Sequence, residues 1–412
     1  MAGGNSKTLK GLIVAVGLTV AAITLWGFSH RLYATLLPGL APAFALTPAQ
    51  SDMARSAIAL GYLLMCLPTA VISRNLGYKT GMLFGLGTFA VGMFLVYPAV
   101  ERHSITFFLV SATVVGSGLA ILEVTALPLV TFLGPRKTAC QRMILAESLS
   151  PFGAVLALYM GPKILASTAA TPHNLVLLLS TVGVAAIVLA FVMEMVPFPA
   201  VATVRTAPGE PTLASFSPPL RIKRFRYAVA ATFLCLFAQI IIAGFAPQFS
   251  RSAMPSLGPD AAQLVLVGCY SALGVGRIVG PLMMRWIAPL RLTVLFAGAS
   301  AICCVLSVVT SGPAAIAGVL GTCFFMSIIF PAIFADALID LGDMAKSATA
   351  ILMFVAFTGT GLFALLAVVC TPAALHGIML LPALCFAGVT AAAVVLKRTR
   401  TATPEERSDV EV

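Results

Sequence analysis

Long apolar stretches recur along almost the whole chain, separated by short polar loops. A helix needs about 20 consecutive apolar residues to cross the hydrocarbon core of a bilayer, and this requirement constrains the fold more than any motif. Only 9% of the residues are charged, whereas a soluble domain carries about 25%. Transmembrane β-strands would instead alternate in polarity over roughly ten residues. The sequence therefore predicts an all-α integral membrane protein.

The apolar stretches fall into two sets of six, separated by a polar segment that is rich in proline. The predicted spans lie near 11–37, 54–73, 78–99, 104–133, 141–167 and 173–196, and then near 226–249, 261–286, 289–310, 313–340, 346–371 and 374–396. The predicted organisation is an N-terminal six-helix bundle over 1–196, a cytoplasmic linker over 197–224, a C-terminal six-helix bundle over 225–397 and a cytoplasmic tail over 398–412. The first span is not expected to be a cleaved signal peptide, because it continues past Arg31 without a small-residue cleavage site.

The positions of lysine and arginine predict the orientation. With the N-terminus inside, 19 of the 25 basic residues fall on the cytoplasmic side. Because cytoplasmic loops carry the excess of positive charge, both termini are expected in the cytoplasm and the protein in the inner (plasma) membrane. The same loops account for the net charge of +11, so no nucleic-acid partner is expected. None of the nine cysteines form a C-x-x-C pair, and neither a disulfide framework, a metal nor a cofactor is expected.

Four ionisable residues lie inside predicted spans: Arg31, Glu123, Glu147 and Arg277. A charge at the centre of a bilayer costs at least about 2.5–3.5 kcal/mol, so each is a functional candidate. For Arg277, between glycines in "GVGRIVG", the better interpretation is a structural pair with a carbonyl or an acid.

Glu123 is the main candidate for proton coupling. Burial favours the neutral form of a carboxyl and a nearby cation favours its charged form, so a carboxyl under both influences can load and release a proton. The alternative is a permanent Glu–Arg ion pair that holds helices together. Arg31 is then either the counter-ion of Glu123 or an anchor for a substrate oxygen or carboxylate. Glu147 is a second candidate acid, which either reaches the cavity or pairs with Arg142 or Lys137.

Three further residues are candidates for binding the substrate. His30 and Tyr33 flank Arg31, and Tyr33 either offers a ring face and a hydroxyl to a ligand or packs in the core. Gln239, in the middle of a span, has an amide that suits a hydroxyl-rich ligand or a helix–helix hydrogen bond. Asp336 and Asp340 are interpreted as gate or loop charges.

Several segments together resemble the fucose–galactose–glucose proton symporters, a branch of the major facilitator superfamily. The resemblance extends from about residue 20 to 395. It rests on "WGFSHRLYATLLP" (26–38), "GYLLMCLPTAVISRNLGYKTG" (61–81), "LEVTALPLVTFLGP" (122–135), "SPFGAVLAL" (150–158), "RFRYAVAATFLCLFAQ" (224–239), "FFMSIIFPAIFADALIDLG" (324–342) and "LLPALCFAG" (380–388).

The resemblance implies twelve helices, a cavity of alternating access and proton-driven sugar import. It also implies that an aspartate in helix 1 and a glutamate in helix 4 carry the chemistry. Glu123 and Gln239 match residues of the family, whereas Ala34 replaces the aspartate, Leu127 replaces an asparagine and Glu147 replaces a glutamine. The scaffold therefore matches while the pocket differs.

Together these patterns predict a secondary active transporter of a small polar solute, coupled to protons in the import direction and acting as a monomer in the lipid bilayer. The solute would be sugar-like, carboxylate-bearing or zwitterionic. An exporter or an uncoupled facilitator of a metabolite, siderophore or drug-like compound is the first alternative. A receptor or scaffold without transport is the second. An enzyme is not expected, since the sequence contains no metal cluster and no nucleophile–base pair.

Overall fold

The computed structural model describes residues 2–40, 44, 48–167, 171–203, 216–339, 341–370, 375 and 377–399. These residues form helices and loops and contain no strand. Residues 204–215 of the predicted linker, Asp340 and residues 400–412 of the predicted tail lie outside the described residues.

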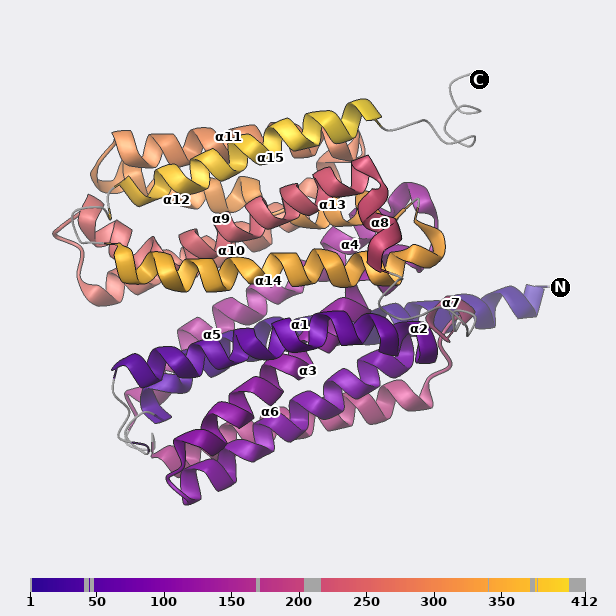
Figure 1. Ribbon diagram of the computed structural model, residues 1–412, viewed down its shortest axis with the longest axis horizontal. Helices are drawn as coiled ribbons and strands as arrows, with labels where there is room; N and C mark the ends of the chain where they lie inside the picture. Colours follow the sequence, from indigo (N-terminus) through magenta and orange to yellow (C-terminus); the bar gives the residue numbers. More distant parts are fainter. Residues whose placement is uncertain are drawn as a thin grey trace.

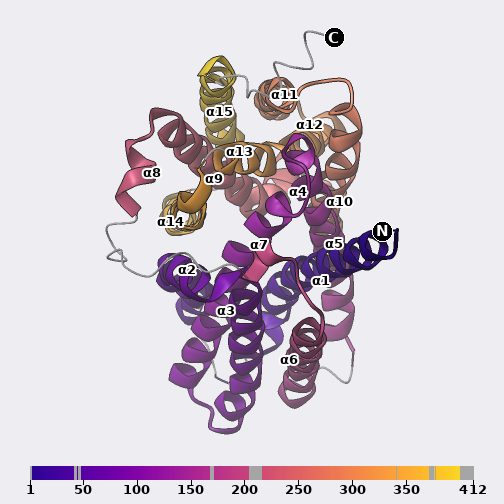
Figure 2. The same ribbon diagram turned by 90° about the vertical axis from the view of Figure 1, so that its right-hand side faces the viewer.

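The helices form two groups that lie one above the other in Figure 1 and are seen end-on in Figure 2. The first group contains α1 (Ala2–Leu40), α2 (Pro48–Glu101), α3 (Ile105–Phe132), α4 (Ala139–Glu147), α5 (Leu149–Leu165) and α6 (Pro172–Met195). The second contains α9 (Lys223–Ala253), α10 (Pro259–Met283), α11 (Pro289–Val309), α12 (Gly312–Met326), α13 (Ile329–Leu338), α14 (Ala345–Val369) and α15 (Leu380–Thr399). Two short helices, α7 (Ala200–Thr203) and α8 (Ser217–Arg221), lie between them in the sequence.

Helix α1 begins, and α15 ends, on the right-hand side of Figure 1. We call this side of the molecule the terminal side and the other the opposite side. The two groups meet where α14 packs on α2 and α10 packs on α5. Helix α4 reaches furthest into the second group, because it packs against α13 and α10.

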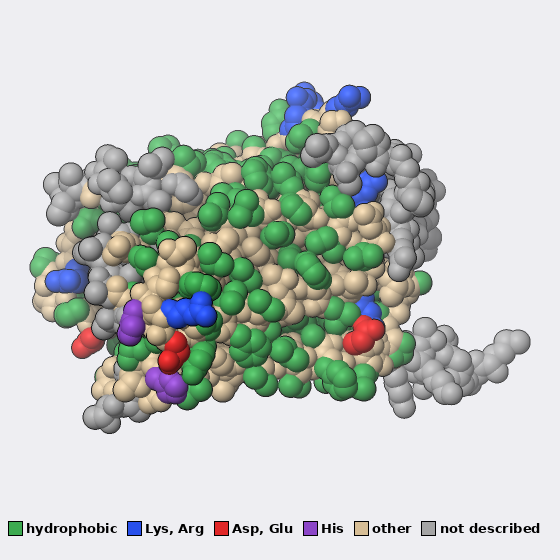
Figure 3. Space-filling view, turned by 60° about the horizontal axis from the view of Figure 1, so that its bottom comes forward, with side chains coloured by type: hydrophobic (Ala, Val, Ile, Leu, Met, Phe, Trp, Pro, Cys, Tyr) green, Lys and Arg blue, Asp and Glu red, His purple; other side chains and the backbone are tan. Residues whose placement is uncertain are grey.

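Ten helices among the described residues are long and apolar enough to cross a membrane. Figure 3 shows hydrophobic side chains across the middle of one face, while the charged side chains gather toward its two ends. The apolar stretch Ala345–Thr360 adds a shorter candidate. The predicted spans and the observed helices agree to within a few residues at most boundaries.

One helix is long enough to cross twice. The candidate span within α2 covers 46 residues, and its backbone leaves helical geometry at Gly77 (φ 86°, ψ 168°). This region of φ and ψ is open essentially to glycine alone, since a Cβ atom clashes there. Gly77 therefore separates the second and third predicted spans.

Two predicted spans are interrupted. The predicted span near 141–167 is found as the candidate span Arg136–Leu165, but Ser148 divides it into α4 and α5. The same holds for 313–340, where Ser327 and Ile328 separate α12 from α13. Both interruptions lie beside the cavity described below.

Glycines bring α2 and α3 close together, as "GSGLAILE" (116–123) suggests. A Cβ atom added to Gly116 would meet the backbone of Ile58, and one added to Gly118 would meet the backbone of Phe89. Small residues serve this purpose in membrane proteins, where helices associate through van der Waals packing. The close contact fixes the position of Glu123 on α3.

Replacing Gly77 with alanine tests its role as the helix break. The variant would place a Cβ atom in a forbidden backbone region and only 2.9 Å from the carbonyl oxygen of Ala202. We expect a loss of stability of about 1–3 kcal/mol, read as a lower melting temperature in detergent. Gly87→Ala is the matched control, since nothing lies within 4 Å of its added Cβ atom. Equal melting temperatures for the two variants would contradict this account.

Candidate functional site

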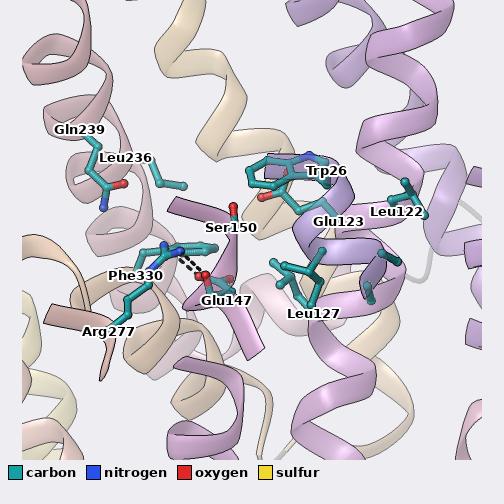
Figure 4. Close-up of a pocket in the computed structure, with 13 residues that line it drawn as sticks. Trp26, Leu122, Glu123, Leu127, Glu147, Ser150, Leu236, Gln239, Arg277 and Phe330 are labelled. Carbon is teal, nitrogen blue, oxygen red and sulfur yellow. Dashed lines mark hydrogen bonds and ion pairs between the residues drawn. The ribbon is translucent and has the colours of Figure 1, made fainter. Parts of the chain in front are cut away.

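A central cavity of about 540 Å³ lies between the two groups of helices. Figure 4 shows the polar side chains that face it from both groups. The lining residues are Ala22, Ile23, Trp26, Leu122, Glu123, Ala126, Leu127, Glu147, Ser150, Leu236, Gln239, Arg277 and Phe330.

Arg277 on α10 and Glu147 on α4 form a buried ion pair across the two groups. The distance from Nη2 of Arg277 to Oε2 of Glu147 is 2.9 Å, and both side chains are at least 90% buried. The guanidinium also donates hydrogen bonds to two backbone carbonyls, that of Glu147 at 3.0 Å from Nη1 and that of Ser327 at 3.3 Å from Nε. This confirms the structural pair predicted for Arg277.

Proline explains why those two carbonyls accept from an arginine. In a regular helix the carbonyl of Glu147 would accept from the N–H of residue 151, and that of Ser327 from residue 331. Both positions are prolines, Pro151 and Pro331, which have no N–H. A freed carbonyl at membrane depth requires another donor. Arg277 therefore supplies the missing donors of two broken helices while it neutralises Glu147.

Glu123 on α3 also faces the cavity. One of its carboxylate oxygens, Oε2, is buried and has no hydrogen-bond partner in the part of the chain that the structure describes. Arg277 instead makes its ion pair with Glu147. Glu123 is thus the carboxyl on the cavity wall that has room for a proton or a ligand donor.

A row of aromatic side chains begins at Trp26, which lines the cavity. The indole Nε1 of Trp26 on α1 donates to the hydroxyl of Tyr62 on α2. The ring of Tyr62 stacks on Phe357 of α14 at a centroid distance of 3.8 Å, which joins the two groups of helices. His30 stacks on Trp26 at 5.9 Å and is half-buried in this aromatic row. Trp26 presents its own ring to the cavity.

Arg31 does not meet Glu123, so the pairing expected between them is wrong. Its guanidinium carbon lies 4.5 Å from the ring centroid of Tyr270 on α10. This cation–π contact offsets part of the free-energy cost of placing a charge inside a membrane span. Arg31 lies closer to the opposite side than the lining residues of α1, Ala22 to Trp26, and is not among them.

The other predicted residues divide between the cavity and the core. Gln239 on α9 lines the cavity, and its amide donates to the Cys235 sulfur at 3.4 Å. Tyr33 is 1% exposed and stacks on Phe108 of α3, which places it in the core and away from the cavity. Of its two expectations, the core position is the one observed.

Charges near the terminal side make other pairs. Glu147 reaches the cavity and pairs with Arg277, whereas Arg142 donates to the carbonyls of Thr131 and Pro135. Asp336 is an ion-pair partner of Arg224, at 2.7 Å, and is buried. It therefore ties α13 to the start of α9, while Asp340 lies outside the described residues.

Trp26, Ser150 and Phe330 line the cavity without having been predicted. Ser150 precedes Pro151 and Phe330 precedes Pro331, so each lies at one of the two helix breaks. The sequence does contain a signal for both helix breaks: at each, a proline stands four residues after a polar residue inside an apolar span.

Further contacts between the two groups lie on the terminal side of the cavity. The Cys140 sulfur is 3.9 Å from that of Met284, and the ammonium of Lys346 lies 5.3 Å from the ring centroid of Tyr78. On the opposite side the contact is that of Arg31 with Tyr270. The cavity is thus bounded by contacts between the groups on both sides. Within the described residues, no three His, Cys, Asp or Glu side chains gather as a metal site.

Comparisons with known proteins give consistent similarities. A sequence profile described as Major Facilitator Superfamily matches residues 18–364. The L-fucose-proton symporter of Escherichia coli K12 is 28% identical over 402 residues, 92% of each chain. A glucose/galactose transporter of Brucella abortus is 27% identical and covers 90% of this chain and 92% of its own. The crystal structure of the E. coli fucose:proton symporter superposes with a TM-score of 0.84 at 26% identity, over 95% of this chain and 100% of that one.

Replacing Arg277 with methionine tests the clamp at the two helix breaks. The variant leaves the Glu147 charge and two carbonyls without their donor, and removing one partner of a buried pair costs about 3–5 kcal/mol. We expect a clearly lower melting temperature in detergent. The double variant Arg277→Met with Glu147→Gln should recover part of this loss, because it removes the unpaired charge.

Arg285→Met is the control, since Arg285 follows α10 and is exposed. Strictly additive effects of the Arg277 and Glu147 substitutions would show that the two side chains do not form a pair.

Proposed function

Because the chain belongs to the Major Facilitator Superfamily, we propose that it is a secondary active transporter that imports a small, sugar-like solute together with protons. The observation that carries this proposal is the central cavity, which is lined from both groups of helices and contains a buried carboxylate oxygen, Oε2 of Glu123, without a hydrogen-bond partner among the described residues. Solute sites of this superfamily lie near the bilayer midplane between two such halves. The chain is a multi-pass protein of the inner (plasma) membrane.

The class of solute is supported by relatives and by the cavity. Relatives over almost the full length are named for the transport of L-fucose, glucose and galactose. The cavity offers a few polar groups, at Glu123, Ser150 and Gln239, beside the indole of Trp26. A sugar-like ring presents hydroxyls at its edge and C–H groups on its face, so it suits amide and carboxylate acceptors next to an aromatic face. Arg31 is not among the lining residues of the central cavity, which removes the main reason to expect a carboxylate on the solute.

Glu123 is the proposed proton site. Its Oε2 has no hydrogen-bond partner among the described residues, and Arg277 makes its ion pair with Glu147 instead. A neutral carboxyl can donate to a solute hydroxyl, and release of its proton on the other side of the membrane would weaken that bond. Solute and proton would therefore move together.

Alternating access requires that contacts on the two sides break in turn. On the terminal side these are the pair of Arg277 with Glu147 and the contact of Cys140 with Met284. On the opposite side it is Arg31 with Tyr270. A proton that reaches Glu147 would cancel its charge and weaken the pair with Arg277, which makes Glu147 the proposed link between protonation and opening toward the terminal side.

The proposed topology has twelve spans in two bundles, over 1–196 and 225–397, with both termini in the cytoplasm. The break at Gly77 turns ten long helices into eleven candidates, and α14 is the twelfth. The terminal side is then the cytoplasmic side, where most basic loops lie. A monomer is sufficient for this mechanism, because the cavity is complete within one chain.

Glu123→Gln tests the proton site. The amide resembles the neutral carboxyl, so the variant should still bind solute and exchange it across the membrane of proteoliposomes. Accumulation driven by an imposed pH gradient should fall at least tenfold, since no proton is carried at this position. Uptake of labelled L-fucose, galactose and glucose, with and without the gradient, measures both activities.

Gln239→Glu is a useful comparison, because it changes the polar groups of the same cavity and leaves Glu123 in place. If Glu123→Gln accumulates solute as the unmodified protein does, the proton is carried elsewhere and the assignment fails.

A further inference from the structure

A second cavity adjoins the central one. Its volume is about 320 Å³, and it lies between α9, α10 and α12 of the second group. Gln239 lines both cavities, so they meet at this side chain. The remaining lining residues are Ile242, Ala243, Leu266, Cys269, Tyr270, Leu273, Cys323 and Met326.

The second cavity differs in chemistry from the first. Apart from Gln239 and the Tyr270 hydroxyl its lining is apolar, and no Asp, Glu, Lys, Arg or His is among its lining residues. The central cavity contains Glu123, Glu147 and Arg277. A ligand that occupies both must therefore have a polar part and an apolar part.

Sulfur and aromatic groups make up much of the second cavity. Cys269, Cys323 and Met326 place three sulfur atoms in its wall, and Tyr270 adds an aromatic ring. Sulfur makes favourable contacts with the edges of aromatic rings. The Tyr270 ring is also in contact with the Arg31 guanidinium, whose carbon lies 4.5 Å from the ring centroid.

We propose that the second cavity binds an aryl substituent of the transported solute, while the polyol part of that solute binds in the central cavity. This inference rests on the proposed function and narrows its substrate class to aryl-substituted sugar-like compounds. Gln239 lies at the junction, where its amide can bond the linking oxygen of an aryl glycoside. Closure of the opposite side by Arg31 and Tyr270 then senses whether the substituent is in place.

The fluorescence of Trp26 can be used to measure ligand binding. The chain has two tryptophans, of which Trp26 lines the central cavity and Trp286 is 80% exposed. In a Trp286→Phe protein the fluorescence of Trp26 reports ligand binding. The probes are the methyl and phenyl glycosides of galactose, glucose and L-fucose, with phenol as the fragment without a sugar.

We expect the best phenyl glycoside to bind at least tenfold more tightly than its methyl counterpart, and phenol to bind far more weakly than either. Ala243→Leu fills the second cavity from α9, and Leu273→Phe narrows it from α10. Each should weaken binding of the phenyl glycoside at least tenfold more than binding of the methyl glycoside. Ala230→Leu, on an exposed position of α9, is the matched control and should change neither.

Equal affinities for methyl and phenyl glycosides, or equal effects of Ala243→Leu on both, would overturn the inference and leave the proposed function standing. If no glycoside binds at all, the proposed function fails and the inference fails with it. If Ala243→Leu or Leu273→Phe fails to fold, its melting temperature will show this. The other of the two variants, and the binding of all glycosides to the protein without either substitution, then still test the inference.

Discussion

The arrangement of the central cavity depends on one buried guanidinium. Arg277 lies where an unpaired charge would be prohibitively costly, and three acceptors surround it: the carboxylate of Glu147 and the carbonyls of Glu147 and Ser327. Two of these acceptors exist only because Pro151 and Pro331 cannot donate to them. The charge and the two broken helices therefore stabilise each other, and neither would be tolerated alone in an apolar environment.

This interaction also joins the two groups of helices. Arg277 belongs to α10 and Ser327 to the break before α13, whereas Glu147 ends α4 of the first group. Because Glu147 is neutralised by Arg277, Glu123 remains as the cavity acid whose Oε2 has no partner among the described residues. The two acids therefore differ in their contacts: Glu147 is paired with Arg277 across the two groups of helices, and Glu123 is not. Arg31 makes a separate contact between the two groups of helices: its guanidinium lies over the ring of Tyr270, closer to the opposite side.

Much of the fold could be predicted from the sequence, because span length and apolar content are local properties. The helix boundaries, the membership of Glu123, Glu147 and Gln239 in the cavity, and the structural pairing of Arg277 follow from such local patterns. The choice of partners could not be predicted in the same way. Which acid meets which arginine depends on how helices distant in sequence are placed, so Arg31 was expected beside Glu123, whereas the arginine found next to the cavity acids is Arg277, paired with Glu147. Tyr33 shows the same limit, since a rotation of the helix by half a turn or less separates a core position from a cavity position.

The central claim is that the two groups must separate on the terminal side during transport. Cys140 and Met284 meet there, 3.9 Å apart between sulfur atoms, and both are buried. In a chain that retains Cys140 alone among its cysteines, Met284→Cys creates a pair that oxidation can join across the groups. Uptake into proteoliposomes should stop on oxidation and return on reduction, with no such effect in either single-cysteine protein. Full transport by the oxidised, cross-linked protein would contradict the account.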